Sequence, residues 1–218
     1  MKTDTQLQKD IIDELRWEPR ISDREIGVAV KDGVVSLTGS VPSYSEKYVA
    51  EAVVESFSGV KAIANDLTVK LPSNSVRTDT EIAHQVVSAL LWDVNVPDTK
   101  VMARVADGWV TLEGNVEYAF AKQAAYLAVR NLTGVRGVTN LIEVTPAPVS
   151  SFDVTQKIKD ALRRRADQDM ERIVVTTTDG VVTLSGSVPS FAERRTAETA
   201  AWSAPGVKNV KDNLVVAV

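Results

Sequence analysis

Apolar and polar residues follow one succession of patterns along the chain, and that succession occurs three times. It begins with apolar residues at helical spacing, such as Ile82, Val86, Val87 and Leu90, which should all face a core. Strictly alternating apolar residues come next, as between residues 26 and 30, and this alternation is typical of a half-buried strand. A second strand, a second helix and a third strand complete each copy, so the predicted order is α-β-β-α-β.

Three ten-residue segments align without gaps and indicate that the copies are true repeats. They span residues 32–41, 107–116 and 179–188, and each begins with Asp-Gly between alternating apolar residues. Asp-Gly in this setting predicts a tight hairpin turn in which both residues adopt a positive φ. A Gly-Val pair follows each segment at the same distance, where a second helix should end in a left-handed glycine cap. The expected turn glycines are Gly33, Gly108 and Gly180, and the expected cap glycines are Gly59, Gly134 and Gly206.

The repeats define three modules of the α+β class. We expect the modules to span residues 1–71, 76–145 and 151–218, each with two helices covering one face of a three-stranded mixed sheet. The linkers between the modules are short and contain proline, which limits their freedom. Each module should therefore contact its neighbours.

Composition narrows the chemistry that the chain can perform. Charged residues make up 25% of the chain and hydrophobic residues 44%, as in an ordinary globular protein. The absence of cysteine excludes disulfides, thiolate catalysis and zinc–sulfur sites, and the single histidine, His84, excludes a multi-histidine metal site. His84 belongs to the polar face of its predicted helix, and no nucleophile motif or inward-facing pair of carboxylates accompanies it. We therefore expect a protein that is not an enzyme and uses no cofactor or metal.

The charge balance argues against a nucleic-acid partner. The net charge is −4, with 29 acidic and 25 basic residues, whereas a general nucleic-acid binder needs a basic field. Residues 134–137 have the Gly-x-x-Gly spacing of a KH module, but this spacing occurs in one copy only. It also joins a helix to a strand, whereas a KH module places it between helices.

The order of the elements and two recurring motifs resemble the BON domain. The first motif is Asp-Gly-x-Val-x-Leu-x-Gly-x-Val, seen in residues 32–41. The second spans residues 59–69 and contains Asn65, in whose place the third copy has Asp212. This resemblance covers almost the whole chain and implies a non-catalytic, stress-associated protein that binds a phospholipid surface or an envelope-associated partner. The alternative is an osmotic-stress protein that acts as a protein–protein scaffold, or in a chaperone-like way, in the cytoplasm.

The sequence shows neither a secretory signal nor a membrane-spanning stretch. Residues 1–6 contain neither an apolar run nor a cleavage site, and no apolar stretch is long enough to span a bilayer. Secreted three-part members of the family carry a signal peptide. We therefore expect a cytoplasmic protein.

Tryptophans mark candidate contact sites. Trp17 and Trp92 occupy matching places near the ends of the first helices, away from the apolar stripe, where an aromatic residue is typical of an interface. The alternative is that each folds back over the first strand of its module. Trp202 stands where the other copies have Glu55 and Arg130, which we expect to be solvated, so it should either contact a neighbouring module or be offered to a partner.

Basic residues concentrate in the third module, which alone has a net positive charge. Because cations near a surface are attracted to anionic headgroups, we expect the lipid or partner contact here, beside Trp202. A solvated helix end, with cations placed favourably at the negative end of the helix dipole, is the alternative. The basic residues are Lys157, Arg163, Arg164, Arg165, Arg194 and Arg195.

Overall fold

The computed structural model describes residues 3–21, 26–146, 151–165 and 173–216. Module one contains α1 (Asp4–Trp17), β1 (Ile26–Lys31), β2 (Val34–Val41), α2 (Tyr44–Glu55), β3 (Ala62–Asn65) and β4 (Thr68–Val69). Module two contains α3 (Asp79–Trp92), β5 (Val101–Ala106), β6 (Trp109–Val116), α4 (Ala119–Arg130), β7 (Gly137–Asn140) and β8 (Glu143–Val144). Module three contains α5 (Ser151–Arg165), β9 (Val174–Thr178), β10 (Val181–Val188), α6 (Phe191–Trp202) and β11 (Asn209–Val216). Short 3₁₀ helices lie at Ser73–Ser75 in the first linker and at Asp98–Lys100 before β5.

Each module has a mixed sheet with the second strand of the module at its centre. In module one, β2 pairs antiparallel with β1 and parallel with β3 and β4. Module two repeats this arrangement around β6, and module three repeats it around β10. The predicted α+β class, with three repeated α-β-β-α-β modules, is therefore confirmed.

The last strand of the module departs from the prediction in the first two copies, where it is broken into two pieces. Asn65 closes β3 by accepting a hydrogen bond on its side-chain oxygen from the Leu67 amide at 3.3 Å. Asn140 makes the same local turn with the Ile142 amide at 3.2 Å. In module three the strand stays continuous, although Asp212 accepts from the Leu214 amide at 2.9 Å.

The hairpin turns adopt the conformation that the sequence predicts. Asp32 and Gly33 have φ values of 54° and 80°, and the turns of the other two modules match them. The positive φ predicted for the turn and cap glycines is confirmed at Gly33, Gly108, Gly180, Gly59, Gly134 and Gly206.

In the first two modules a carboxylate from the first turn of the first helix accepts hydrogen bonds from the amides of the hairpin turn. Asp79 accepts the amides of Asp107 and Gly108 at 2.9 and 2.8 Å, and Asp4 does the same in module one.

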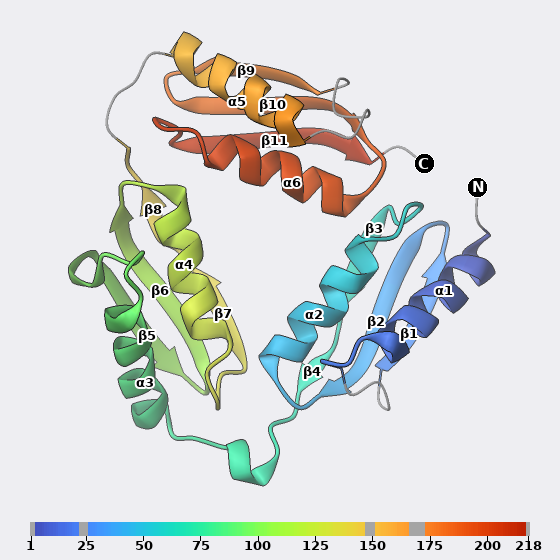
Figure 1. Cartoon of the computed structure of the whole chain (residues 1–218). Coiled ribbons are helices and arrows are strands. Elements are labelled where there is room, and N and C mark those ends of the chain that lie inside the picture. Colours follow the sequence, from blue (N-terminus) through green and yellow to red (C-terminus); the bar gives the residue numbers. More distant parts are fainter. Residues whose placement is uncertain (1–2, 22–25, 147–150, 166–172, 217–218) are drawn as a thin grey trace.

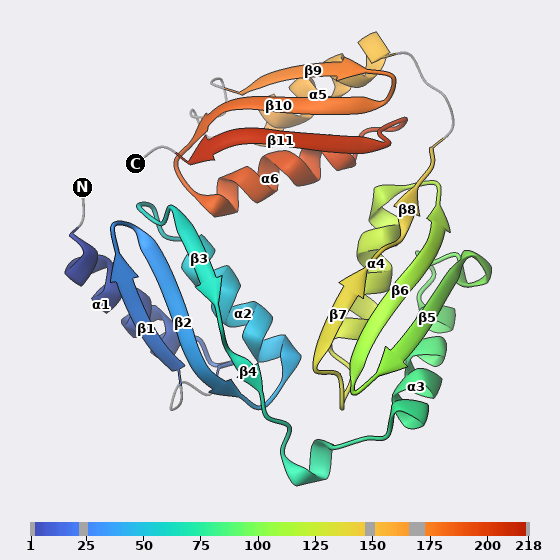
Figure 2. The same cartoon turned by 180° about the vertical axis from the view of Figure 1, so that it is seen from behind.

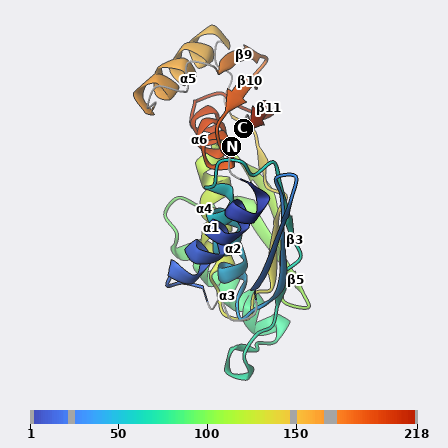
Figure 3. The same cartoon turned by 90° about the vertical axis from the view of Figure 1, so that its right-hand side faces the viewer.

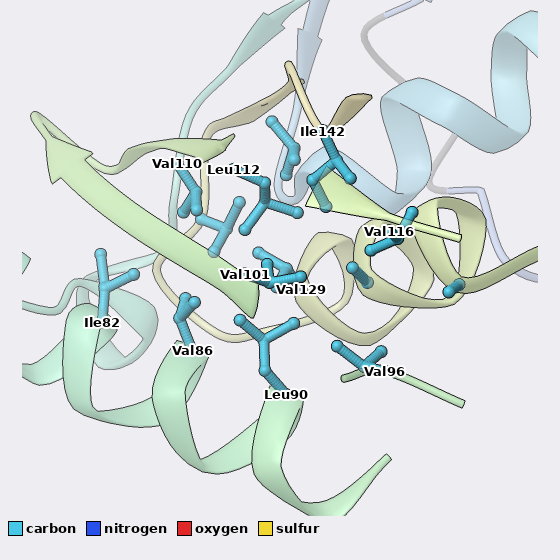
Figure 4. Close-up of a cluster of buried hydrophobic side chains, with 14 residues drawn as sticks. Ile82, Val86, Leu90, Val96, Val101, Val110, Leu112, Val116, Val129 and Ile142 are labelled. Carbon is cyan, nitrogen blue, oxygen red and sulfur yellow. The ribbon is translucent and has the colours of Figure 1, made fainter. Parts of the chain in front are cut away.

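Each module has its own hydrophobic core between the helices and the sheet. In module two, Ile82, Val86 and Leu90 of α3 pack against the apolar side chains of β6 and α4 (Figure 4). The prediction that Val87 faces this core is wrong, because its side chain is 62% exposed. One residue beyond Val86 is a rotation of about 100° around the helix, which carries Val87 off the narrow buried stripe.

The three modules surround a common centre. The second helices α2, α4 and α6 face inward, and the first helices α1, α3 and α5 lie further out (Figure 1). Turned by 180°, the molecule shows the open faces of the sheets (Figure 2). Seen from its edge, α1, α3 and α5 lie on one side and the sheets on the other (Figure 3). The molecule therefore has a helical side and a sheet side.

Candidate interaction surfaces

Trp17 and Trp92 are among the most exposed large side chains in the described part of the chain. They are the last residues of α1 and α3, and their side chains are 82% and 84% exposed. The chain turns into extended backbone at the next residue, so neither indole reaches the first strand of its module. The interpretation that these tryptophans fold back onto the module is therefore wrong, and both remain available for a contact.

Trp92 belongs to a larger apolar surface at the end of α3. Leu91 is 61% exposed and Val94, two residues past the helix, is 96% exposed. Val87 lies one helical turn before Leu91, on the same side of α3. We call Val87, Leu91, Trp92 and Val94 the α3 apolar face. Large apolar side chains that are exposed together at one end of a helix are candidates for a binding surface.

The matching positions of the other first helices have a different chemistry. In place of Val87, Leu91 and Trp92, α1 has Ile12, Arg16 and Trp17, and α5 has Lys159, Arg163 and Arg164. The corresponding surface is therefore apolar in module two, mixed in module one and basic in module three. Lys157 of α5 is exposed as well, whereas the side chains of Arg163, Arg164 and Arg165 lie outside the described residues.

Two of the predicted basic contact residues are engaged inside the molecule. The Arg194 Nε lies 2.6 Å from a carboxylate oxygen of Asp212, so this arginine stabilises the last strand of its own module. The Arg195 Nη1 lies 2.5 Å from Glu55 of module one. Trp202 is half-buried against the core of module three. α6 faces the centre of the molecule (Figure 1), but the Arg195 side chain remains 46% exposed. The expected lipid or partner contact at these three residues therefore stays a prediction.

Inward-facing side chains of α2 and α4 contact each other between modules one and two. The Arg130 guanidinium of α4 lies over the Tyr48 ring of α2, 4.0 Å from its centroid, in a cation–π contact. The Tyr44 and Tyr126 hydroxyls share a hydrogen bond of 3.2 Å between the same two helices. The expectation that Glu55 and Arg130 are solvated is therefore wrong. The expected contact between neighbouring modules is present for modules one and two, and for modules one and three.

Burial changes the acid–base behaviour of this junction. Desolvation raises the pKa of the Glu55 carboxyl, and the nearby Glu51 adds to that rise, while Arg195 opposes it. Burial also raises the pKa of the Tyr126 hydroxyl, as does its hydrogen bond to Tyr44. Arg195 therefore compensates only part of the cost of burying the Glu55 charge.

The residues that the structure describes contain neither a candidate metal site nor a membrane-spanning helix. Among them, no group of three or more histidine or acidic side chains is placed to hold a metal ion. No helix within the described ranges is long and apolar enough to cross a membrane.

The module sequence decides the family. The BON domain profile matches residues 3–70, 78–146 and 150–218, which is nearly the whole chain. The chain belongs to the BON domain family. Each of the α-β-β-α-β modules is thus a BON domain, and the α3 apolar face belongs to the second of them.

Two known BON proteins are similar in sequence. Osmotically-inducible protein Y of Escherichia coli strain K12 is 32% identical over 143 residues, which cover 62% of this chain and 71% of that protein. Outer membrane lipoprotein DolP of Haemophilus influenzae is 33% identical over 115 residues, which cover 52% of this chain and 58% of that protein. The solved structure of CdsD, a structural protein of the type III secretion system of Chlamydia trachomatis, covers 95% of this chain and 90% of its own. Its identity is 16% and its TM-score 0.27, too low to support an argument.

Proposed function

We propose that this protein binds phospholipid surfaces through the α3 apolar face, as a non-catalytic component of an osmotic or envelope stress response. The exposure of Leu91, Trp92 and Val94 at one end of α3 is the observation that carries the proposal. Tryptophan suits the headgroup layer because its ring is apolar and its N–H is polar. An amphipathic helix with such a face lies in the plane of the membrane surface.

The arrangement of the modules favours one extended membrane-facing side. The helices α1, α3 and α5 lie on the same side of the molecule (Figure 3). A flat surface approaching this side meets these three helices, two of which end in an exposed tryptophan, Trp17 or Trp92. Lys157 of α5 is exposed and supplies positive charge, and each near-surface cation contributes on the order of 1 kcal/mol of attraction to an anionic membrane.

The relatives support the biological setting. One is by its name osmotically inducible, and another is an outer membrane lipoprotein. A protein-binding scaffold is the rival function, because an exposed apolar surface also suits a protein partner. The two functions differ in whether purified lipid alone captures the protein.

Vesicle flotation separates the two functions. The full chain is mixed at low salt with vesicles of phosphatidylcholine and phosphatidylglycerol, and separately with vesicles of phosphatidylcholine alone. We expect the protein to float with the anionic vesicles. Leu91→Glu combined with Trp92→Glu should weaken binding by roughly tenfold or more, which corresponds to about 1.4 kcal/mol.

Met102→Glu is the matched control. Met102 lies on β5 of the same module and is 69% exposed, but it belongs to the sheet side of the molecule. This variant should bind as the unmodified protein does. If the unmodified protein ignores anionic vesicles at low salt, the lipid proposal is wrong and the scaffold function takes its place. Equal losses for the α3 and β5 variants would mean that the α3 apolar face is not the contact.

A further inference from the structure

Trp109 lies flat on the open sheet face of module two, on the side opposite the first helices. A Cβ built at Gly137 would fall 2.4 Å from the indole ring, so the ring covers this glycine directly. The indole Nε1 donates a hydrogen bond of 2.8 Å to the Thr139 hydroxyl. These two contacts fix one ring face against the sheet. Trp109 nevertheless remains 50% exposed, which leaves the other ring face open to solvent.

We call the indole of Trp109, lying on Gly137, the Trp109 platform, and it is specific to module two. Trp109 pairs with Gly137 in the β6–β7 register, whereas module one pairs Val34 with Ala62 at the matching place. Module three pairs Val181 with Asn209 there. The fold therefore tolerates a side chain in place of the glycine when the partner is small. Glycine is needed at residue 137 because the indole occupies the space of a side chain.

Hydrogen-bonding side chains follow the exposed ring along the sheet. The next row across the three strands contains Arg104, Thr111 and Thr139. One row further, Glu113 lies 3.9 Å from Arg104, and both side chains are largely exposed. The open aromatic face is thus followed along the sheet by two hydroxyls and a guanidinium in the next row and by a carboxylate in the row beyond (Figure 2 shows this sheet from its open side). These groups can donate and accept in several directions around the ring.

We propose that this platform binds the pyranose ring of a β-linked glycan. A pyranose with equatorial substituents has a flat face of C–H groups, which carry partial positive charge and stack on the negative face of an aromatic ring. Its hydroxyls lie around the edge, where Thr111 and Arg104 of the neighbouring row can bond them. An apolar protein partner would leave these polar groups unpaired. A nucleobase would bring phosphates to a chain of net charge −4, beside Glu113.

Two kinds of variant test the proposal, because Trp109 is held in place by Gly137. One kind displaces the indole ring, and the other removes it. Gly137→Ala keeps the indole but forces it off the sheet. Trp109→Val removes it. Trp109→Val combined with Gly137→Ala recreates the Val34 and Ala62 pair of module one, so this variant should fold normally and serves as the control for structure.

The experiment is a titration of the full chain with cellohexaose and with chitohexaose, followed by nuclear magnetic resonance through the indole N–H signals of its tryptophans and, in the variants without Trp109, through the backbone amide signals of module two. At least one sugar should shift the Trp109 signal and leave those of Trp17 and Trp92 in place. Gly137→Ala and the double variant should each weaken binding by roughly tenfold or more.

Failure of both sugars to shift the Trp109 signal would overturn the proposal. A shift produced by a single-stranded oligonucleotide but by neither sugar would replace the glycan with a nucleobase. Retention of sugar binding in the double variant, with its melting temperature unchanged, would place the site elsewhere. These outcomes do not depend on vesicle binding, because the platform lies on the sheet side of the molecule.

Discussion

At the scale of single residues, the turn glycines hold each hairpin in a conformation that other residues resist. Gly108 has a φ of 75°, and a Cβ there would lie 3.0 Å from the Gly134 carbonyl oxygen. Gly108→Val should therefore lower the free energy of unfolding by about 1 to 3 kcal/mol. Urea denaturation measures the loss, with the exposed Ala106→Val in the same hairpin as the control. Equal stability of the two variants would mean that the turn tolerates a β-branched residue.

The sequence alone predicts the backbone conformation of the turns better than the burial of the tryptophans. The Asp-Gly turns follow from local backbone chemistry, so their positive φ could be predicted without knowledge of packing. The exposure of Trp92 and the burial of Trp202 could not. Both lie off the apolar stripe of their helices, but Trp202 packs against the core of its own module and Trp92 does not. Helical periodicity gives the faces of a helix, whereas the burial of each face depends on the tertiary packing around it.

At the scale of elements, the carboxylate of Asp79 ties the start of α3 to the hairpin turn. It accepts two turn amides, and its negative charge also suits the positive end of the helix dipole. Module three has Ser151 at the matching position. Asp79→Ser should therefore cost about 1 to 3 kcal/mol of stability, since it removes two hydrogen bonds to a charged group. Thermal and urea unfolding should both report the loss, and an unchanged midpoint would show that the serine replaces both bonds.

The elements themselves were largely predictable because each has local sequence signals. Thr78 and Ser43, residue types that favour the start of a helix, cap α3 and α2, and each accepts a backbone amide three residues further on. The break in the last strand was not predicted. It occurs where Asn65 or Asn140 turns its side chain back to a nearby amide, but Asp212 makes a similar bond without breaking the strand. This side-chain bond alone therefore does not decide the break.

At the scale of the whole molecule, Glu55 links the docking of modules one and three to pH. Burial raises its pKa in the docked state above the ordinary carboxyl value of 4.5. A raised pKa means that the docked state binds the proton more tightly. Its contribution to docking is therefore fully present below pH 4.5 and is lost as the pH rises through the raised pKa.

Energy transfer between two dyes measures this docking. The chain has no cysteine, so Lys31→Cys in module one and Thr176→Cys in module three provide unique labelling sites on exposed positions. Transfer should fall as the pH is raised from 4.5 to 7, and Glu55→Gln should remove this dependence. Transfer that rises with pH would show instead that the ion pair with Arg195 outweighs the cost of burying the Glu55 charge.

Depth-dependent quenching of Trp92 tests most directly whether the α3 apolar face enters a phospholipid surface. Replacing Trp17, Trp109 and Trp202 by Phe leaves Trp92 as the single tryptophan of the chain. On anionic vesicles its emission should shift to shorter wavelength, and lipids brominated near the headgroup should quench it more strongly than lipids brominated near the chain ends. Emission and quenching that stay as in buffer, while the protein floats with the vesicles, would contradict the account.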